Sequence, residues 1–223
     1  MRSRSSTLNL TFHGVGEAPG PRDPGEERFW LDLESFTSVL DSVVDRPEVR
    51  ITFDDGNASD VLHALPALRR RGLTATFFVV AGRLGAPGFL DDTGVRALLD
   101  AGMAVGCHGL SHRPWRGLGD EALHQELFLA RRALETVAER PVTDAACPFG
   151  SYDRRVLRSL RRYGYEHVYT SDRGVARPGA WLQPRNSLER EPGAGSADRI
   201  LAPATSRAPT LVARARRAAK RWR

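Results

Sequence analysis

Segments with strand character alternate with segments of helical periodicity along most of this chain, and short loops rich in Gly and Pro join them. The β-branched and aromatic residues of LTATFFVVAG predict a buried strand, and Val61, Leu65 and Leu68 before it follow the spacing of an apolar helix face. This alternation predicts an α/β fold with a parallel sheet, because each helix returns the chain to start another strand in the same direction. The expected strands are 8–12, 50–56, 73–82, 103–109, 144–150, 167–172 and 180–186, and the expected helices are 32–45, 57–71, 93–101, 120–140 and 154–163.

Polar motifs stand where three of the expected strands end. TFDDG ends at Gly56, GCHGLSH at His112 and CPFGSY at Tyr152. A closed barrel gathers its catalytic groups from several strand ends at one face, whereas an open sheet places a site at one switch point between strands. Three contributing strand ends therefore favour a barrel, or a distorted relative of one, over a doubly wound open sheet.

The basic charge of the chain is concentrated near its end. The sequence has 33 Lys and Arg against 27 Asp and Glu, which gives a net charge of +6. Seven of the basic residues lie in 207–223, where there is no acidic residue, so the rest of the chain is close to neutral. A nucleic-acid-binding body needs a basic face within the fold, so we expect no nucleic-acid partner. We expect one catalytic domain over 1–205 and a basic C-terminal tail over 206–223.

Two interpretations of the tail stay open. Residues 209–223 can be drawn as a helix with Leu211 and Trp222 on a stripe that is otherwise alanine. A solvated tail is the simpler interpretation, and the alternative is an interfacial helix through which 207–223 contacts an anionic membrane. The sequence contains no apolar run of spanning length and no signal-peptide core near its start. We therefore expect a cytoplasmic protein, located at the inner face of the membrane if the tail binds lipid.

A candidate metal site combines two histidines with a pair of aspartates. His108 and His112 are four residues apart, so one helical turn would point both imidazoles to the same side. Asp54 and Asp55 can supply a third ligand and leave an open position, as in catalytic zinc sites. Because adjacent side chains of a strand diverge, one carboxylate can bind the metal while the other handles protons. Taken singly, the histidines also fit two surface residues, and the aspartates fit a polar loop or a helix cap.

The three motifs together resemble those of the NodB-type polysaccharide deacetylases, carbohydrate esterase family 4. TFDDG stands at 52–56, the histidine pair is followed by Pro114 with Arg113 between, and PFG occupies 148–150. The likeness extends over roughly 50–175 and includes YGYEHVYTSDRG at 163–174. It implies a distorted (β/α) barrel of the polysaccharide deacetylase type and metal-dependent hydrolysis of an N-acetyl or O-acetyl group on a sugar. A carbohydrate is thus the expected substrate.

The resemblance also assigns roles to residues. Asp55 would bind the metal together with His108 and His112, and Asp54 would be the general base that takes a proton from the metal-bound water. The backbone N–H of Phe149 would stabilise the oxyanion. Zn²⁺ is the expected metal for two histidines and an aspartate, with Co²⁺ or Ni²⁺ as alternatives.

Two positions depart from the family pattern. Asp144 stands where the family often has an arginine that orients the base, and no histidine follows His167 to act as the general acid. His13 is a substitute acid if closure of a barrel brings it beside Asp54, and otherwise it caps a loop. Arg185 is a substitute for the orienting charge, against the alternative of an ordinary surface ion pair.

Substrate contacts are expected from Pro148, Trp115 and Arg185. Trp115 lies three residues after His112, so its indole is a candidate platform for a sugar ring. Burial in the core is the alternative for this tryptophan.

Three functions remain open. The leading one is a metal-dependent carbohydrate deacetylase. The second is hydrolysis of another amide, such as a formamide or a cyclic ureide, since one scaffold hosts several related chemistries. The third is a sugar-binding pseudoenzyme that has lost the acid and the orienting arginine. The complete set of Asp54, Asp55, His108 and His112 argues against the third, because a binding module does not need all four.

Overall fold

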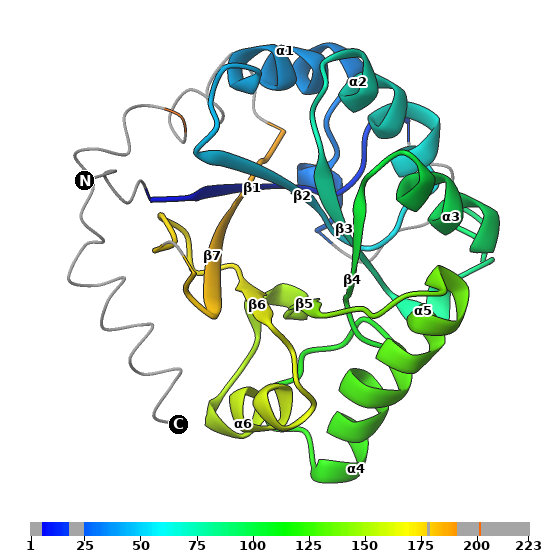
Figure 1. Cartoon of the computed structure of the whole chain (residues 1–223), viewed down its shortest axis with the longest axis vertical. Coiled ribbons are helices and arrows are strands. Elements are labelled where there is room, and N and C mark those ends of the chain that lie inside the picture. The colour runs from blue at the N-terminus through cyan, green and yellow to red at the C-terminus, as the bar shows by residue number, and fades with distance from the viewer. Residues whose placement is uncertain (1–5, 18–24, 178, 191–200, 202–223) are drawn as a thin grey trace.

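The fold is a barrel of seven short parallel strands. The computed structural model describes residues 6–17, 25–177, 179–190 and 201. Strands that are consecutive in the chain pair with one another, and the last strand pairs with the first to close the barrel (Figure 1). This closure confirms the predicted barrel and excludes the open sheet. The strands are β1 Leu8–Phe12, β2 Val49–Phe53, β3 Ala75–Val79, β4 Ala104–Cys107, β5 Asp144–Ala146, β6 His167–Thr170 and β7 Leu182–Ser187.

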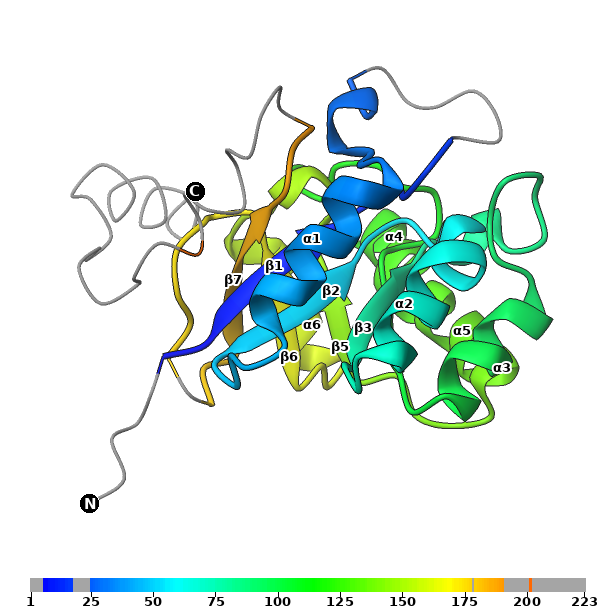
Figure 2. The ribbon, with the colours of Figure 1, turned by 90° about the horizontal axis from the view of Figure 1, so that it is seen from above.

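Helices cover the outside of the barrel except beside β7, where none of the described helices lies (Figures 1 and 2). Three of them begin at an aspartate, Asp32, Asp91 or Asp153, whose side chain accepts a hydrogen bond from a backbone N–H three residues on. The α-helices are α1 Leu33–Val43, α2 Leu65–Arg70, α3 Asp92–Asp100, α4 Asp120–Leu123, α5 Ala130–Ala138 and α6 Arg154–Arg162. Short 3₁₀ turns occupy Glu27–Phe29, Ala81–Arg83 and Pro148–Gly150, and π-helical segments occupy Asp60–Ala64 and His124–Leu129. The predicted helices 57–71 and 120–140 each contain one of these π-helical segments.

The apolar core lies between the barrel and the helices. Phe12, Phe53 and Phe77 occupy matching registers of β1, β2 and β3, and their rings stack with centroid distances of 5.2 and 4.6 Å. Phe36 of α1 meets the edge of the Phe12 ring at 5.1 Å. All four rings are fully buried, so this stack anchors the first helix to the first three strands.

The opposite faces of the same strands line a polar lumen. The hydroxyls of Thr11 on β1 and Thr52 on β2 lie 2.9 Å apart, and both residues are buried. Because side chains two residues apart share a face of a strand, His13 and Asp54 continue these two rows at the carboxyl end of the barrel. The pleat therefore aims both side chains toward the mouth of the lumen.

In the part of the chain that the structure describes, no helix combines the length and apolar character needed to cross a bilayer. The predicted tail 206–223 lies outside the described residues, and both interpretations of it remain predictions.

Candidate active site

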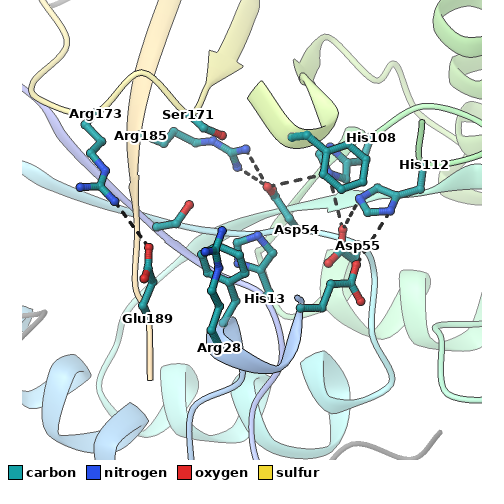
Figure 3. Close-up of a pocket in the computed structure, with 14 residues that line it drawn as sticks. His13, Arg28, Asp54, Asp55, His108, His112, Ser171, Arg173, Arg185 and Glu189 are labelled. Atoms are coloured by element: carbon teal, nitrogen blue, oxygen red, sulfur yellow. Dashed lines mark hydrogen bonds and ion pairs between the residues drawn. The ribbon is translucent and has the colours of Figure 1, made fainter. Parts of the chain in front are cut away.

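A cavity of about 280 Å³ opens at the carboxyl ends of the strands. Its walls include His13 after β1, Asp54 and Asp55 after β2, His108 after β4, and Arg185 of β7 (Figure 3). Residues that are far apart in the chain thus meet at one face of the barrel, which is where a (β/α) barrel carries its catalytic groups.

The two predicted histidine ligands meet Asp55 in the wall of this cavity. His112 Nε2 lies 3.1 Å from Asp55 Oδ1, and His108 Nε2 lies 3.5 Å from the same oxygen. The helical-turn argument for the histidine pair is wrong, because 108–112 is a loop in which Gly109 and His112 have φ values of 85° and 50°. The left-handed turns of this loop, and not a helix face, bring the two imidazoles together.

The donor set of Asp55, His108 and His112 fits a divalent cation. One ligand atom from each residue lies within 4.8 Å of the other two, and all three residues are buried. His108 Nδ1–H donates to the carbonyl of Ala146 at 2.9 Å, which leaves the lone pair of Nε2 facing Asp55. Burial lowers the pKa of His108 to about 4, so the imidazole is neutral. Among the described residues, Asp55 Oδ1 has no hydrogen-bond partner of good geometry. Two imidazoles beside a buried carboxylate oxygen make a zinc-type ligand set.

The strongest contacts of Asp54 are with Arg185 (Figure 3). The two terminal nitrogens of the guanidinium donate to the two oxygens of Asp54 at 2.5 and 2.7 Å. Burial acts to raise the pKa of Asp54, but the charge and the hydrogen bonds of Arg185 outweigh it and lower the pKa. Asp54 is therefore an ionised carboxylate in a fixed orientation, 3.8 Å from His108 Nε2.

Arg185 lies inside the lumen, so the surface ion-pair alternative is excluded. Its side chain is 1% exposed, and a terminal nitrogen lies 3.4 Å from the hydroxyl of Thr52. The guanidinium carbon is 5.2 Å from the centre of the Phe78 ring. Gly106 on the neighbouring strand leaves room for that ring, since a Cβ there would lie 2.5 Å from it. The guanidinium lines the cavity with its terminal nitrogens already bound to Asp54, which makes it a partner of the carboxylate more than a free substrate contact.

His13 lies in the cavity wall near both aspartates. The pairing of β1 with β2, in which Phe12 is opposite Phe53, places His13 beside Asp54. His13 is therefore beside Asp54 because β1 and β2 are neighbouring strands, and not because the barrel closes, as was expected from the sequence. The imidazole stacks on the ring of Phe29 with a centroid distance of 4.6 Å. Its buried Nδ1 has no hydrogen-bond partner among the described residues.

Two of the predicted substrate contacts are wrong. Trp115 is fully buried in the main core and presents no face to a sugar. The loop after His112 has already turned inward at that point. Pro148 is also buried and does not line the cavity, whereas the next residue, Phe149, does. The Phe149 ring is 59% exposed and lies 4.7 Å from the His112 ring, and its backbone has a left-handed φ of 55°.

Asp144 and His167 lie at the far end of the barrel from the cavity. They occupy matching registers at the first residues of β5 and β6, and Asp144 Oδ1 is 3.1 Å from His167 Nδ1. His167 therefore has a structural contact and does not line the cavity.

Glu126, which was not predicted as a site residue, holds the loop of His112. This buried carboxylate accepts hydrogen bonds from the backbone N–H groups of Leu110 at 2.8 Å and Ser111 at 3.3 Å. It also accepts from Arg113 Nε at 2.9 Å and from the hydroxyl of Ser111. Burial acts to raise the pKa of Glu126, but these hydrogen bonds together lower it. A signal was present in the sequence, because an acidic residue three positions after Leu123 falls on the apolar face of the predicted helix.

Glu126→Gln is expected to loosen this loop. Its amide NH₂ would face the donors of Ser111 and Arg113, which costs about 1–3 kcal/mol of the free energy of unfolding. Because the loop positions His112, we also expect Zn²⁺ affinity to fall about 10- to 100-fold. Urea unfolding and calorimetric titration with Zn²⁺ measure the two effects. Glu121→Gln, an exposed change on α4, is the control, and equal behaviour of the two variants would contradict the assignment.

A closed parallel barrel that gathers a buried Asp–His–His cluster and a paired aspartate at its strand ends defines a barrel enzyme of the (β/α) type. The polysaccharide deacetylase model matches residues 41–168, more than half of the sequence, and the chain belongs to this family.

Individual relatives agree with this assignment. A Bacillus subtilis (strain 168) protein named as a polysaccharide deacetylase, YxkH, is 25% identical over 203 residues, which are 84% of this chain and 73% of that protein. The deacetylase PplD of Streptococcus pyogenes, solved in complex with acetate, superimposes with a TM-score of 0.76 at 19% identity, covering 90% of this chain and 98% of that one. IcaB from Ammonifex degensii gives a TM-score of 0.73 at 21% identity, covering 90% and 97%. At these identities the two structures support the fold.

Proposed function

We propose that this protein is a divalent-metal-dependent hydrolase that removes acetyl groups from N-acetylated, or O-acetylated, sugars of a glycan or glycan precursor. The observation that best supports the proposal is that the two adjacent aspartates have different partners. Asp55 faces His108 and His112, and Asp54 is held ionised by Arg185. Zn²⁺ is the proposed metal, with Co²⁺ or Ni²⁺ able to occupy the same ligand set.

The chain's own residues supply the proton transfers of this hydrolysis. A divalent ion held by Asp55, His108 and His112 would acidify water and polarise the acyl carbonyl. Asp54 accepts a proton from the attacking water, whose oxygen forms a bond to the acyl carbon. The bidentate contact with Arg185 keeps Asp54 ionised and aimed for this step.

Collapse of the tetrahedral intermediate needs a donor and an oxyanion contact. As the C–N bond breaks, the leaving amine takes a proton, and His13 is the proposed donor because its imidazole lies in the cavity wall. The backbone N–H of Phe149 is proposed to bind the oxyanion, from a residue that also lines the cavity. The products are acetate and the free amino sugar.

Two other functions remain as alternatives. Another amide, such as a formamide or cyclic ureide, could be cleaved by the same residues. A sugar-binding pseudoenzyme is less well supported, because the Asp54–Arg185 pair and the buried ligand set are both intact. The cytoplasmic location and the membrane contact through 207–223 are proposals that rest on sequence.

The first test is acetate release from N-acetylglucosamine oligomers by the purified chain. We expect EDTA to stop release and added Zn²⁺ or Co²⁺ to restore it, while Asp54→Asn lowers the metal-restored rate by about 10²–10⁴-fold. Asp45→Asn, an exposed change of the same chemistry, is the control. If the chain released formate from N-formyl sugars and no acetate from N-acetyl sugars, the function would instead be hydrolysis of another amide. Bound metal without any turnover would favour the pseudoenzyme.

A further inference from the structure

The cavity has a second polar wall that the reaction does not use. It lies on the side of Asp54 away from His112 and contains Arg28, Arg173 and Glu189 (Figure 3). We propose that this wall is a subsite for an anionic group, a phosphate or a carboxylate, carried by the acetylated sugar substrate, and that Arg28 and Arg173 bind it. The inference rests on the proposed function, since it names the class of sugar that enters the same cavity.

Arg28 offers an exposed guanidinium held in a defined place. Its guanidinium carbon lies 4.5 Å from the centre of the Phe29 ring, and that ring in turn stacks on His13. Among the described residues no carboxylate lies within ion-pair distance of Arg28. A guanidinium restrained by an aromatic ring loses less freedom when it binds an anion, so its contact is stronger than that of a free surface arginine.

Arg173 reaches the same wall from a strained backbone. Its φ of 59° is in the left-handed region, which costs a non-glycine residue roughly 1–2 kcal/mol. The next residue, Gly174, is fixed by Asn186, whose side chain accepts from its N–H and donates to its carbonyl, each at 2.8 Å. The N–H of Arg173 itself donates to the carbonyl of Arg185 at 3.1 Å. Backbone strain retained at the edge of a cavity is typical of functional residues.

The preceding residue anchors the other side of this turn. Asp172 accepts hydrogen bonds from the hydroxyl of Tyr152 at 2.6 Å and from that of Thr170 at 3.1 Å. The turn is thus tied to β6 on one side and to β7 on the other. The anchors determine where the side chain of Arg173 leaves the backbone.

Among the described residues of this wall, guanidinium groups outnumber carboxylates. Arg185 and Asp54 neutralise each other, and Glu189 Oε1 lies 3.5 Å from a terminal nitrogen of Arg173. The other lining glutamate, Glu26, lies toward the opposite end, 3.9 Å from His112 Nδ1. In the described part of this wall, the guanidinium groups of Arg28 and Arg173 accompany one carboxylate, that of Glu189. Within a concave site such a field attracts anions more strongly than on an open surface, and guanidinium groups match phosphate and carboxylate in geometry.

Matched pairs of substrates test the inference. For phosphate, the pair is N-acetylglucosamine 1-phosphate and methyl N-acetylglucosaminide. For carboxylate, it is the disaccharide of N-acetylglucosamine with glucuronic acid and diacetylchitobiose. One charge-assisted contact corresponds to a preference of about 10- to 100-fold in kcat/KM. We expect the metal-loaded chain to show such a preference for at least one anionic member, weakening as salt is raised.

Variants locate the source of the preference. In Arg28→Gln and Arg173→Gln we expect the anionic-to-neutral ratio of kcat/KM to fall to within about threefold of unity. Arg158→Gln, an exposed change on α6 outside the cavity, should keep the ratio of the unaltered chain. Arg173→Gly separates folding from binding. It relieves the left-handed strain, so we expect its melting temperature to be unchanged or higher while the ratio still falls.

Calorimetric titration of the EDTA-treated full chain with the same sugars makes the result independent of turnover. Tighter binding of the anionic members, lost in the two glutamine variants, supports the subsite even if no acetate is released and the proposed function fails. Equal affinities and equal kcat/KM values within each pair would overturn the subsite while the deacetylase stands. A preference that survives in both glutamine variants would also overturn it, because the anion would then bind elsewhere on the chain.

Discussion

Arg185→Met is expected to reduce kcat/KM for acetate release by about 10²–10³-fold, although Arg185 is not one of the proposed ligands, base or acid. The reason is the position of its partner. Asp54 would remain buried without the two hydrogen bonds of 2.5 and 2.7 Å that hold it. Removing one member of a buried ion pair typically costs about 3–5 kcal/mol of the free energy of unfolding. Steady-state kinetics and urea unfolding measure the two losses.

The pH dependence distinguishes this effect from a general loss of structure. In the unaltered protein Arg185 lowers the pKa of Asp54 against the opposing effect of burial. Without the arginine, burial prevails and the pKa of Asp54 rises, so the acid limb of the kcat/KM profile should move to higher pH. A carboxyl group whose pKa is raised in the folded state destabilises the fold at pH values where the same group is ionised in the unfolded chain. The stability difference from the unaltered chain should therefore shrink as pH falls.

Arg185→Lys is the matched control, because it keeps a charge and loses the bidentate geometry. It should retain more activity than Arg185→Met and show a smaller shift of the acid limb. A methionine variant with full activity and an unmoved profile would contradict the role of Arg185.

Asp55→Asn is expected to remove the stabilisation that a divalent ion gives to the fold, and with it the metal-restored activity. Zn²⁺ at a hundred times its dissociation constant stabilises a native protein by about 2.7 kcal/mol. If Asp55, His108 and His112 bind Zn²⁺, adding Zn²⁺ after EDTA should stabilise the fold by this mechanism and raise its melting temperature. The asparagine variant offers no anionic oxygen at this position, so we expect little shift and a loss of activity of at least about 10³-fold.

Asp54→Asn is the control that separates the two aspartates. Both oxygens of Asp54 are bound by Arg185, and Asp54 is not a member of the ligand set, so this variant should keep the Zn²⁺-dependent rise in melting temperature while it loses turnover. Thermal unfolding with and without Zn²⁺ is the measurement. If the two variants lost the metal response equally, the assignment of separate roles would be wrong.

The order of the structural elements could be predicted from sequence because it depends on local patterns. All seven strands were predicted in order, 73–82 from its β-branched and aromatic residues, and β1 was predicted with its observed bounds, Leu8–Phe12. The π-helical segments inside 57–71 and 120–140 were not predicted, since a π turn leaves the apolar periodicity of a helix almost intact. The buried carboxylate of Glu126 lies in one of them.

Sequence spacing predicted which residues form the site, but it did not predict the backbone conformation that brings them together. Asp55, His108 and His112 do converge, but through a loop with left-handed residues and not through a helical turn. Trp115 follows closely in the chain and still lies in the core, because side-chain direction in an irregular loop depends on its packing.

The sequence by itself determined the alternation of strands and helices, the motifs at the strand ends and the membership in a deacetylase family, since each is carried by residues close together in the chain. Only the tertiary structure decided how Asp54 is held. The pairing of β7 with β1 closes the barrel, and it is this closure that brings Arg185 to a carboxylate 131 residues away. Such a contact has no local signature, because it depends on strand register and on a lumen that leaves space for one buried guanidinium beside Phe78.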